Sequence, residues 1–164
     1  MKVRLAEPAD YATLGALTVA AYRAVAGYVG EPAYEDELRD VGTRAAAVDT
    51  DVFVAVADDG AVLGGVTYAT SPASPQAEFD DPDAAGFRML AVDPGAQGSG
   101  AGAALVAAVV ERARADGRRR IIIHSTPWMT TAHGLYTRRG FTRRPDLDWT
   151  PVPGIDLWGF VLEL

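Results

Sequence analysis

A glycine-rich segment in the second half of the chain has the composition of a ligand-binding turn. It follows an apolar run and reads Val92-Asp93-Pro94-Gly95-Ala96-Gln97-Gly98-Ser99-Gly100-Ala101-Gly102. When a strand leads into such a turn and a helix follows at once, backbone N–H groups point into one concavity at the positive end of the helix dipole. Each glycine also removes a Cβ that would keep a ligand away from the backbone. The segment therefore predicts a phosphate or pyrophosphate site.

Two other phosphate-binding motifs fit this segment less well. A P-loop requires a lysine and a serine or threonine after its last glycine, whereas two alanines follow Gly102. The dinucleotide pattern G-x-G-x-x-G/A is matched by Gly98, Gly100 and Ala103. That pattern requires an acid at the end of the next strand, where this chain carries His124, and more parallel strands than the remaining chain can supply. Both motifs are therefore disfavoured.

Hydrophobic periodicity predicts the elements that must hold this turn. We expect a strand over residues 87–92 before the turn and a helix over 102–116 after it. The helix carries an apolar stripe at helical spacing, formed by Leu105, Val106, Val109 and Ala113. Further elements are expected after it: a strand over 121–125, a helix over 130–139 and a final strand over 157–164.

The first half of the chain predicts a second group of elements. A short strand over residues 3–5 is followed by helices over about 8–22 and 35–47. Strands over 51–57 and 61–69 are joined by Asp59-Gly60, a strong signal for a tight hairpin. Residues 71–86, rich in proline and acids, read as a loop. The order βααββ and then βαβαβ predicts a single mixed α/β domain over residues 1–164.

Composition restricts the classes of function. The chain of 164 residues is 49% hydrophobic and 23% charged, which is ordinary for a globular domain. It contains no cysteine, which excludes disulfides, thiolate metal sites and a cysteine nucleophile. Residues 1–7 lack the apolar core of a secretory signal, and the longest apolar run, 101–110, is shorter than the ~20 residues that cross a bilayer. We therefore expect a cytoplasmic protein that does not associate with membranes.

Charge is distributed unevenly along the chain. The net charge of −7 argues against nucleic-acid binding. Residues 31–83 hold 13 acidic side chains and two arginines, whereas residues 84–144 hold ten arginines and three acids. The two stretches could form two solvated faces. Alternatively, the second could bind an anionic ligand and the first a cationic one.

Three blocks of sequence resemble the GCN5-related N-acetyltransferase (GNAT) family. Gln97-x-x-Gly100-x-Gly102 resembles the Q/R-x-x-G-x-G/A signature that holds the coenzyme A pyrophosphate in that family. The segment Leu90-Ala91-Val92-Asp93-Pro94 is similar to the L-x-V-x-P that ends the family's fourth strand. Residues 132–141 are similar to its A-x-x-L-Y-x-x-x-G-F segment. The blocks occur in the family's order and spacing, over residues 87–141.

The resemblance implies a fold and a co-substrate. The fold would be a mixed, mostly antiparallel sheet of about six to seven strands with four helices, in which the central parallel strands splay apart. The co-substrate would be acetyl-CoA, with no metal. Its pantetheine arm would lie along the fourth strand beside Leu90, Ala91 and Val92. Its pyrophosphate would be held at the glycine turn, by Gln97, Gly98, Ser99, Gly100, Ala101 and Gly102.

The resemblance also implies a mechanism, in which an amine attacks the thioester directly. Tyr136 matches the family's tyrosine that protonates the departing thiolate, a role for which a phenol is suited because it keeps its proton at neutral pH. A tyrosine packed in the core is the alternative. Without a cysteine in the chain, an acyl-cysteine intermediate is excluded.

The general base has no direct counterpart. Some relatives carry a glutamate or histidine at two positions of the fourth strand, which here are Gly86 and Arg88. His124 on the expected fifth strand is the best side-chain alternative, because an imidazole changes its protonation near neutral pH. His133 and a water relay to an acid of residues 78–83 remain open.

The acceptor and the assembly are less constrained. Tyrosines and acids of the first half would suit a cationic amine such as a polyamine, an aminoglycoside or a lysine side chain, whereas Arg88 would favour an acceptor with a carboxylate. Two alternatives are a non-catalytic acyl-CoA-binding module and a CoA-dependent transferase with another acyl group or a hydroxyl acceptor. The apolar residues 157–164 could form a homodimer interface or complete the sheet.

Overall fold

Eight strands form one sheet in the structure, a computed structural model that describes all 164 residues. The strands are β1 (Lys2–Leu5), β2 (Thr50–Val56), β3 (Val62–Ala69), β4 (Ala84–Val92), β5 (Arg120–Ser125), β6 (Thr142–Arg143), β7 (Trp149–Val152) and β8 (Ile155–Glu163). Their order is β1-β2-β3-β4-β5-β8-β6, and β7 pairs with the beginning of β8. Only β4 and β5 run parallel. The sheet is therefore mixed and mostly antiparallel, as expected.

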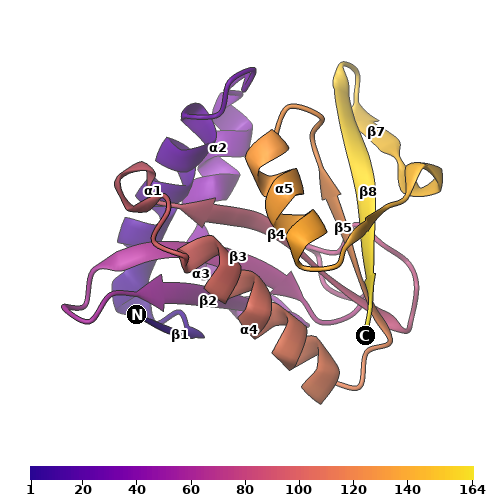
Figure 1. The fold of residues 1–164 in the computed structure, drawn as a ribbon. Helices are drawn as coiled ribbons and strands as arrows, with labels where there is room; N and C mark the ends of the chain where they lie inside the picture. The colour runs from indigo at the N-terminus through magenta and orange to yellow at the C-terminus, as the bar shows by residue number, and fades with distance from the viewer.

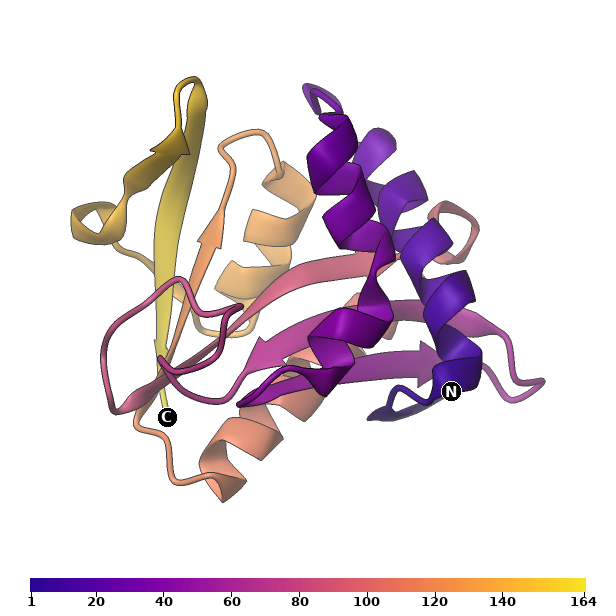
Figure 2. The same cartoon turned by 180° about the vertical axis from the view of Figure 1, so that it is seen from behind.

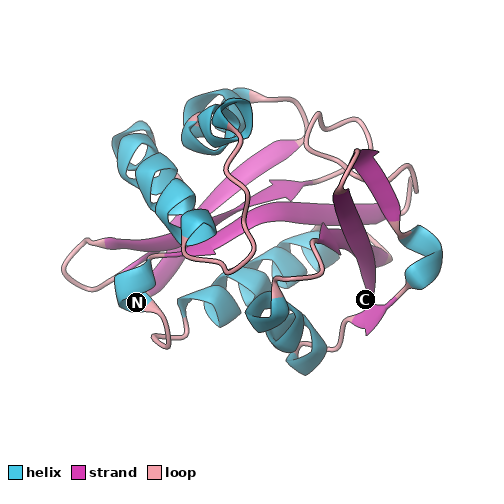
Figure 3. Ribbon diagram, turned by 90° about the horizontal axis from the view of Figure 1, so that it is seen from above, coloured by secondary structure: helices cyan, strands magenta, loops and turns pink.

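Helices cover both faces of this sheet (Figure 3). They are α1 (Tyr11–Arg23), α2 (Pro32–Arg39), α3 (Val41–Ala46), α4 (Ala101–Ala115) and α5 (Thr130–Arg138). On one face, Leu105 of α4 and Tyr136 of α5 belong to the largest buried cluster. On the other face, Leu14 and Leu17 of α1 pack with Val41 of α3 over β2. No helix has both the length and the apolar character that a membrane span requires.

The two parallel strands separate soon after they begin. Pairing between β4 and β5 is confined to Ala84 with Arg120 and Ala85 with Ile121. Beyond these residues the strands diverge (Figures 1 and 2), while β5 continues in antiparallel register with β8. The edge of β4 that faces β5 therefore has no strand partner past Ala85. This confirms the splayed central strands.

A β-bulge interrupts β4 where it pairs with β3, on the side opposite its free edge. Gly65 of β3 pairs with Ala91, but Thr67 pairs with Arg88, so that two residues of β4 lie opposite one residue of β3. One of them, Met89, has a φ of 54°, which is rare for a residue other than glycine. The bulge turns Met89 to the face of α1 and α2, where it packs on Val19. It thereby re-aims the residues that follow.

The helix expected over residues 35–47 is two helices. The chain breaks at Asp40, whose side chain accepts a hydrogen bond of 3.0 Å from the Thr43 N–H and caps α3. The guanidinium of Arg44, buried beneath the break, donates to backbone oxygens of Glu37, Leu38 and Asp40. The structure thus has five helices, not four, because a buried cation satisfies the carbonyls that the break exposes.

Two strand boundaries also differ from expectation. Residues 84–86, expected as loop, begin β4, because pairing with β5 buries Ala84 and Ala85 completely despite their weak strand propensity. The unexpected hairpin of β7 and β8 turns at Gly154, which has a φ of 85°. The segment 157–164 completes the sheet, since β8 lies between β5 and β6.

Acids of the first half of the chain pair with arginines of the second half. Arg112 lies 2.8 Å from Asp51, and Arg120 contacts Asp81. Both arginines lie at the end of α4 that is remote from the glycine turn. The charge segregation along the sequence therefore produces ion pairs between elements, and these arginines supply no charge to the turn.

Candidate active site

The glycine turn connects the end of β4 to the beginning of α4. The Asp93 N–H donates to the Leu63 carbonyl at 2.8 Å, and the Asp93 carboxylate accepts from the Gly95 N–H at 2.6 Å. Gly98 and Gly100 have φ values of 82° and 86°, and a Cβ on either would meet no protein atom. Glycine is therefore required there for the left-handed backbone and not for lack of space within the protein.

Five backbone N–H groups of this segment donate no hydrogen bond within the protein. Gln97, Gly98, Ser99 and Gly100 are exposed, and the α4 dipole directs its positive end toward them. The Ala101 N–H differs, because it donates to the Ser99 hydroxyl at 3.3 Å. The unpartnered donors therefore form an exposed cluster of N–H groups suited to an anion. They are the N–H groups of Gln97, Gly98, Gly100, Gly102 and Ala103.

The predicted pantetheine positions lie on the free edge of β4. Leu90 and Val92 are half-buried and pack against the cluster formed with α4 and α5. Ala91 is buried on the opposite face with Leu14 and Val41. The side chains thus anchor the strand from both faces, while its backbone past Ala85 faces the gap toward β5.

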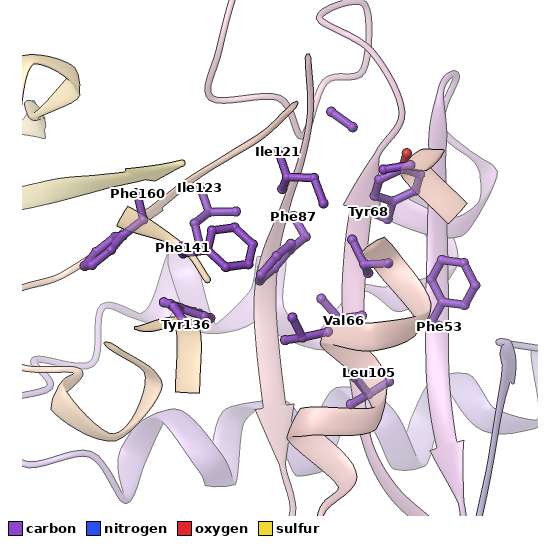
Figure 4. Packing of buried hydrophobic residues seen from close by; sticks show 14 of the residues in the cluster. Phe53, Val66, Tyr68, Phe87, Leu105, Ile121, Ile123, Tyr136, Phe141 and Phe160 are labelled. Atoms are coloured by element: carbon purple, nitrogen blue, oxygen red, sulfur yellow. The ribbon is translucent and has the colours of Figure 1, made fainter. Parts of the chain in front are cut away.

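Tyr136 projects from α5 into a group of aromatic rings (Figure 4). Its ring centroid lies 5.8 Å from those of Phe87, Phe141 and Phe160. Burial raises the pKa of the Tyr136 phenol well above its ordinary value, so the group is protonated at neutral pH. The hydroxyl makes no hydrogen bond to the protein, and it is not fully buried. It can therefore donate to a ligand.

His124 lies on the opposite face of β5. Its Nε2 lies 2.9 Å from the Leu147 carbonyl, which can only accept, so that Nε2 carries the proton. The other ring nitrogen, Nδ1, is buried and has no partner. His133 lies on the Tyr136 face instead, where its Nε2 contacts the Ser125 hydroxyl at 3.1 Å. Burial lowers the pKa of His133.

A small pocket between β4 and β5 joins His124 to Gln76, which the sequence did not single out, and to Glu78, one of the acids of residues 78–83 considered for a water relay. Gln76 and Glu78, from the loop before β4, line this pocket together with Gly86. Glu78 also lies 3.2 Å from Arg88. The loop containing these residues was expected, and Glu78 was one of its several acids. No local pattern distinguishes it, because its place depends on a contact across the sheet.

A profile of the acetyltransferase (GNAT) family matches residues 18–141 of the chain. Curated protein sequences yield no significant match. Among solved structures, a GCN5-related N-acetyltransferase from Kribbella flavida is similar, with 24% identity, a TM-score of 0.75, and coverage of 99% of this chain and 97% of that chain.

Two further solved structures are similar over their lengths. A ribosomal-protein-alanine N-acetyltransferase from Brucella melitensis has 20% identity and a TM-score of 0.70, with 100% of both chains covered. The yncA protein from Salmonella typhimurium, solved with its cofactor acetyl-CoA, has 21% identity and a TM-score of 0.69, with coverage of 99% of this chain and 93% of that chain. These structures agree in fold, and the family profile, which spans the glycine turn, the splayed strands and Tyr136, leads to one assignment. The chain belongs to the acetyltransferase (GNAT) family.

Proposed function

We propose that the protein transfers an acetyl group from acetyl-CoA to a primary amine by direct attack within a ternary complex. The observation that carries this proposal is the cluster of five unpartnered N–H groups at the beginning of α4, next to a strand edge that has no partner. A diphosphate supplies oxygen acceptors for these N–H groups, and a pantetheine arm carries amides that can pair with a strand edge.

The residues present fit this substrate. The N–H groups of Gln97, Gly98 and Gly100 would hold the diphosphate, and the backbone of Leu90 and Val92 would pair with the pantetheine arm. A backbone N–H near the β4 bulge would polarise the thioester carbonyl and stabilise the negative charge that develops on its oxygen. Family membership supports the same placement.

In the proposed reaction, the acceptor nitrogen forms a bond to the carbonyl carbon and the carbon–sulfur bond breaks. Tyr136 gives its proton to the departing sulfur, and the nitrogen of the new amide loses the proton that restores the phenol. This role is consistent with a phenol that burial keeps protonated and whose hydroxyl has no protein partner. The chain has no cysteine that could carry the acetyl group in between.

The acceptor that we favour is a cationic amine. Arg88, the cation expected to attract a carboxylate, lies 3.2 Å from Glu78 and 3.8 Å from Glu37. Its charge is therefore already matched by two carboxylates. Asp36 and Asp40 of the neighbouring polar pocket are exposed and add negative charge. The resulting field favours an ammonium over a carboxylate.

Calorimetry with acetyl-CoA and an acetylation screen of amines test the proposal. We expect saturable binding of acetyl-CoA, and turnover of polyamines or lysine-containing peptides in preference to acidic amino acids. An absence of acetyl-CoA binding would contradict the role assigned to the five N–H groups. Binding without turnover of any amine would leave an acyl-CoA-binding module, and turnover confined to anionic amino acids would contradict the cationic acceptor.

A further inference from the structure

Three buried polar atoms without hydrogen-bond partners line the small pocket between β4 and β5. They are Gln76 Oε1, Glu78 Oε2 and His124 Nδ1. Buried polar atoms are nearly always satisfied, and a group of them around one space commonly indicates an ordered water. They come from two segments that meet only in the folded protein. The pocket is therefore formed by tertiary contacts between the loop before β4 and strand β5, where β4 and β5 separate.

The pocket has room for about one water molecule. Gly86 of β4 provides this room, because a Cβ there would lie 2.6 Å from both the Ile122 carbonyl oxygen and the Phe79 ring. The rings of Phe79 and Phe87 form apolar walls. A water in this place would therefore be held by the three polar atoms between apolar walls.

The hydrogen-bonding capacities of the pocket suit a water that passes a proton. His124 offers a lone pair at Nδ1, because its Nε2–H donates to Leu147. Glu78 uses one oxygen toward Arg88 and offers the other. A water donates to these two acceptors and accepts from the Gln76 amide once that amide is turned by 180°, an orientation that hydrogen bonding decides. One lone pair of the water then remains for an ammonium.

We propose that this water carries a proton from the bound acceptor ammonium to His124. The inference rests on the acetyl transfer proposed above. The ammonium gives one proton to the water, the water gives one of its own protons to His124 Nδ1, and the neutral nitrogen attacks. His124 takes up the proton, while Glu78 and Gln76 are positioning residues that hold the water.

Charged groups on each side determine how the resulting imidazolium is stabilised. Glu78 faces it from the loop, and Asp148, bound to Arg143, approaches from the segment before β7. Arg88 from β4 opposes it but is matched by Glu78 and Glu37. The imidazolium that the relay forms would therefore lie between two carboxylate–arginine pairs, Glu78 with Arg88 and Asp148 with Arg143.

The test compares His124→Gln and Glu78→Gln with two further variants. Glutamine at position 124 can still donate to the Leu147 carbonyl but cannot take up a proton. His133→Gln tests the other candidate base, and the control is Asp80→Asn, an exposed acid two residues from Glu78. Each variant is assayed for acetyl-CoA binding by calorimetry. Its kcat/KM is measured between about pH 5 and 9 with the preferred basic amine.

A strongly basic amine stays protonated over this range, so a fall in kcat/KM at low pH reports a group of the enzyme. We expect the wild type to show such a fall and then a plateau. His124→Gln should lower kcat/KM about 100-fold at neutral pH and replace the plateau with a continuous rise, following the small fraction of neutral amine. Glu78→Gln should move the fall to lower pH, because the imidazolium loses a neighbouring carboxylate.

A second measurement uses the aminooxy isostere of the same acceptor, which is already neutral at pH 7. The loss caused by His124→Gln should shrink to less than about 10-fold with this isostere, because little proton removal is needed. All variants should bind acetyl-CoA as the wild type does. A crystal structure should contain a water within hydrogen-bonding distance of the three polar atoms.

The outcomes separate the two proposals. If the wild type turns over amines normally but His124→Gln keeps the plateau, or if the pocket holds no water, the proton relay is wrong and the proposed function stands. A wild type that acetylates no amine overturns both. If His124→Gln does not fold, the shifted pH profile of Glu78→Gln decides alone, and an unshifted profile refutes the relay.

Discussion

His124 and Tyr136 lie on opposite faces of the sheet. Tyr136 packs with Ile121 and Ile123 on the face of α4 and α5, whereas His124 points with Ile122 to the face of Phe79 and Leu147. The sheet therefore lies between the two side chains. Such a placement suits a transfer in which a nucleophile enters from one side and a leaving group departs on the other, because each proton is handled where it is released or needed.

Replacement of Tyr136 by phenylalanine tests the leaving-group side. The variant keeps the ring contacts with Phe87, Phe141 and Phe160 and removes only the hydroxyl. We expect kcat to fall about 100-fold while the Kd for acetyl-CoA stays unchanged. Turnover close to that of the wild type would assign Tyr136 to the core alone.

The alkaline side of the pH profile provides a separate test of Tyr136. Burial favours the neutral phenol and raises its pKa, so that the proton is lost only at a higher pH than from an exposed tyrosine. Rates should therefore not decline because of Tyr136 between about pH 8 and 10, the latter being the ordinary tyrosine value. An alkaline decline below about pH 9 that disappears in Tyr136→Phe would contradict this environment.

Substitution of Gly98 by alanine tests whether the cluster of exposed N–H groups binds acetyl-CoA. Alanine is strained by roughly 1 kcal/mol at a φ of 82°, and relief of that strain displaces the neighbouring N–H groups. We expect the Kd for acetyl-CoA to rise about 10-fold or more. Gly60→Ala is the matched control, because Gly60 has a φ of 94° and equally open surroundings in the β2–β3 hairpin. It should lose similar stability and bind acetyl-CoA normally; equal Kd values for the two variants would contradict the assignment.

Much of the fold could be predicted from local patterns. The hairpin at Asp59-Gly60, the apolar stripe of α4 and the strand–turn–helix around Gly98 each depend on residues that are near in sequence. The break at Asp40 could not be predicted, because the buried Arg44 that stabilises it lies in the next helix. The bulge at Met89 also escapes prediction, since methionine carries no signal for a positive φ.

One part of the candidate site could likewise be predicted from local sequence, and another part could not. The glycine turn and Tyr136 belong to one continuous stretch, and sequence reasoning selected them. The surroundings of His124 arise from three distant segments, which contribute Glu78, Gly86 and Leu147. The sequence could name His124 as a candidate, but the free nitrogen and its neighbours depend on tertiary contacts.

Arg44 should stabilise the fold far more than an exposed arginine. Arg44 is only 3% exposed, and its guanidinium donates to the Thr67 hydroxyl at 3.2 Å as well as to the carbonyls at the end of α2. Burial lowers the pKa of Arg44, but an arginine begins so high that the charge persists at neutral pH. Arg44→Met would leave these buried oxygens without donors, at a cost of about 2–4 kcal/mol in the free energy of unfolding.

Urea unfolding with a graded set of variants measures this contribution. Lysine at position 44 keeps the charge but presents a single ammonium in place of the planar guanidinium, so Arg44→Lys should fall between the wild type and Arg44→Met. Arg114→Met is the control, because the Arg114 side chain is 54% exposed and its partner Glu111 is 73% exposed. That variant should stay within about 0.5 kcal/mol of the wild type. If Arg44→Met were equally mild, water would have to reach the carbonyls at the break, and the buried cation could not be the reason that α2 and α3 remain separate helices.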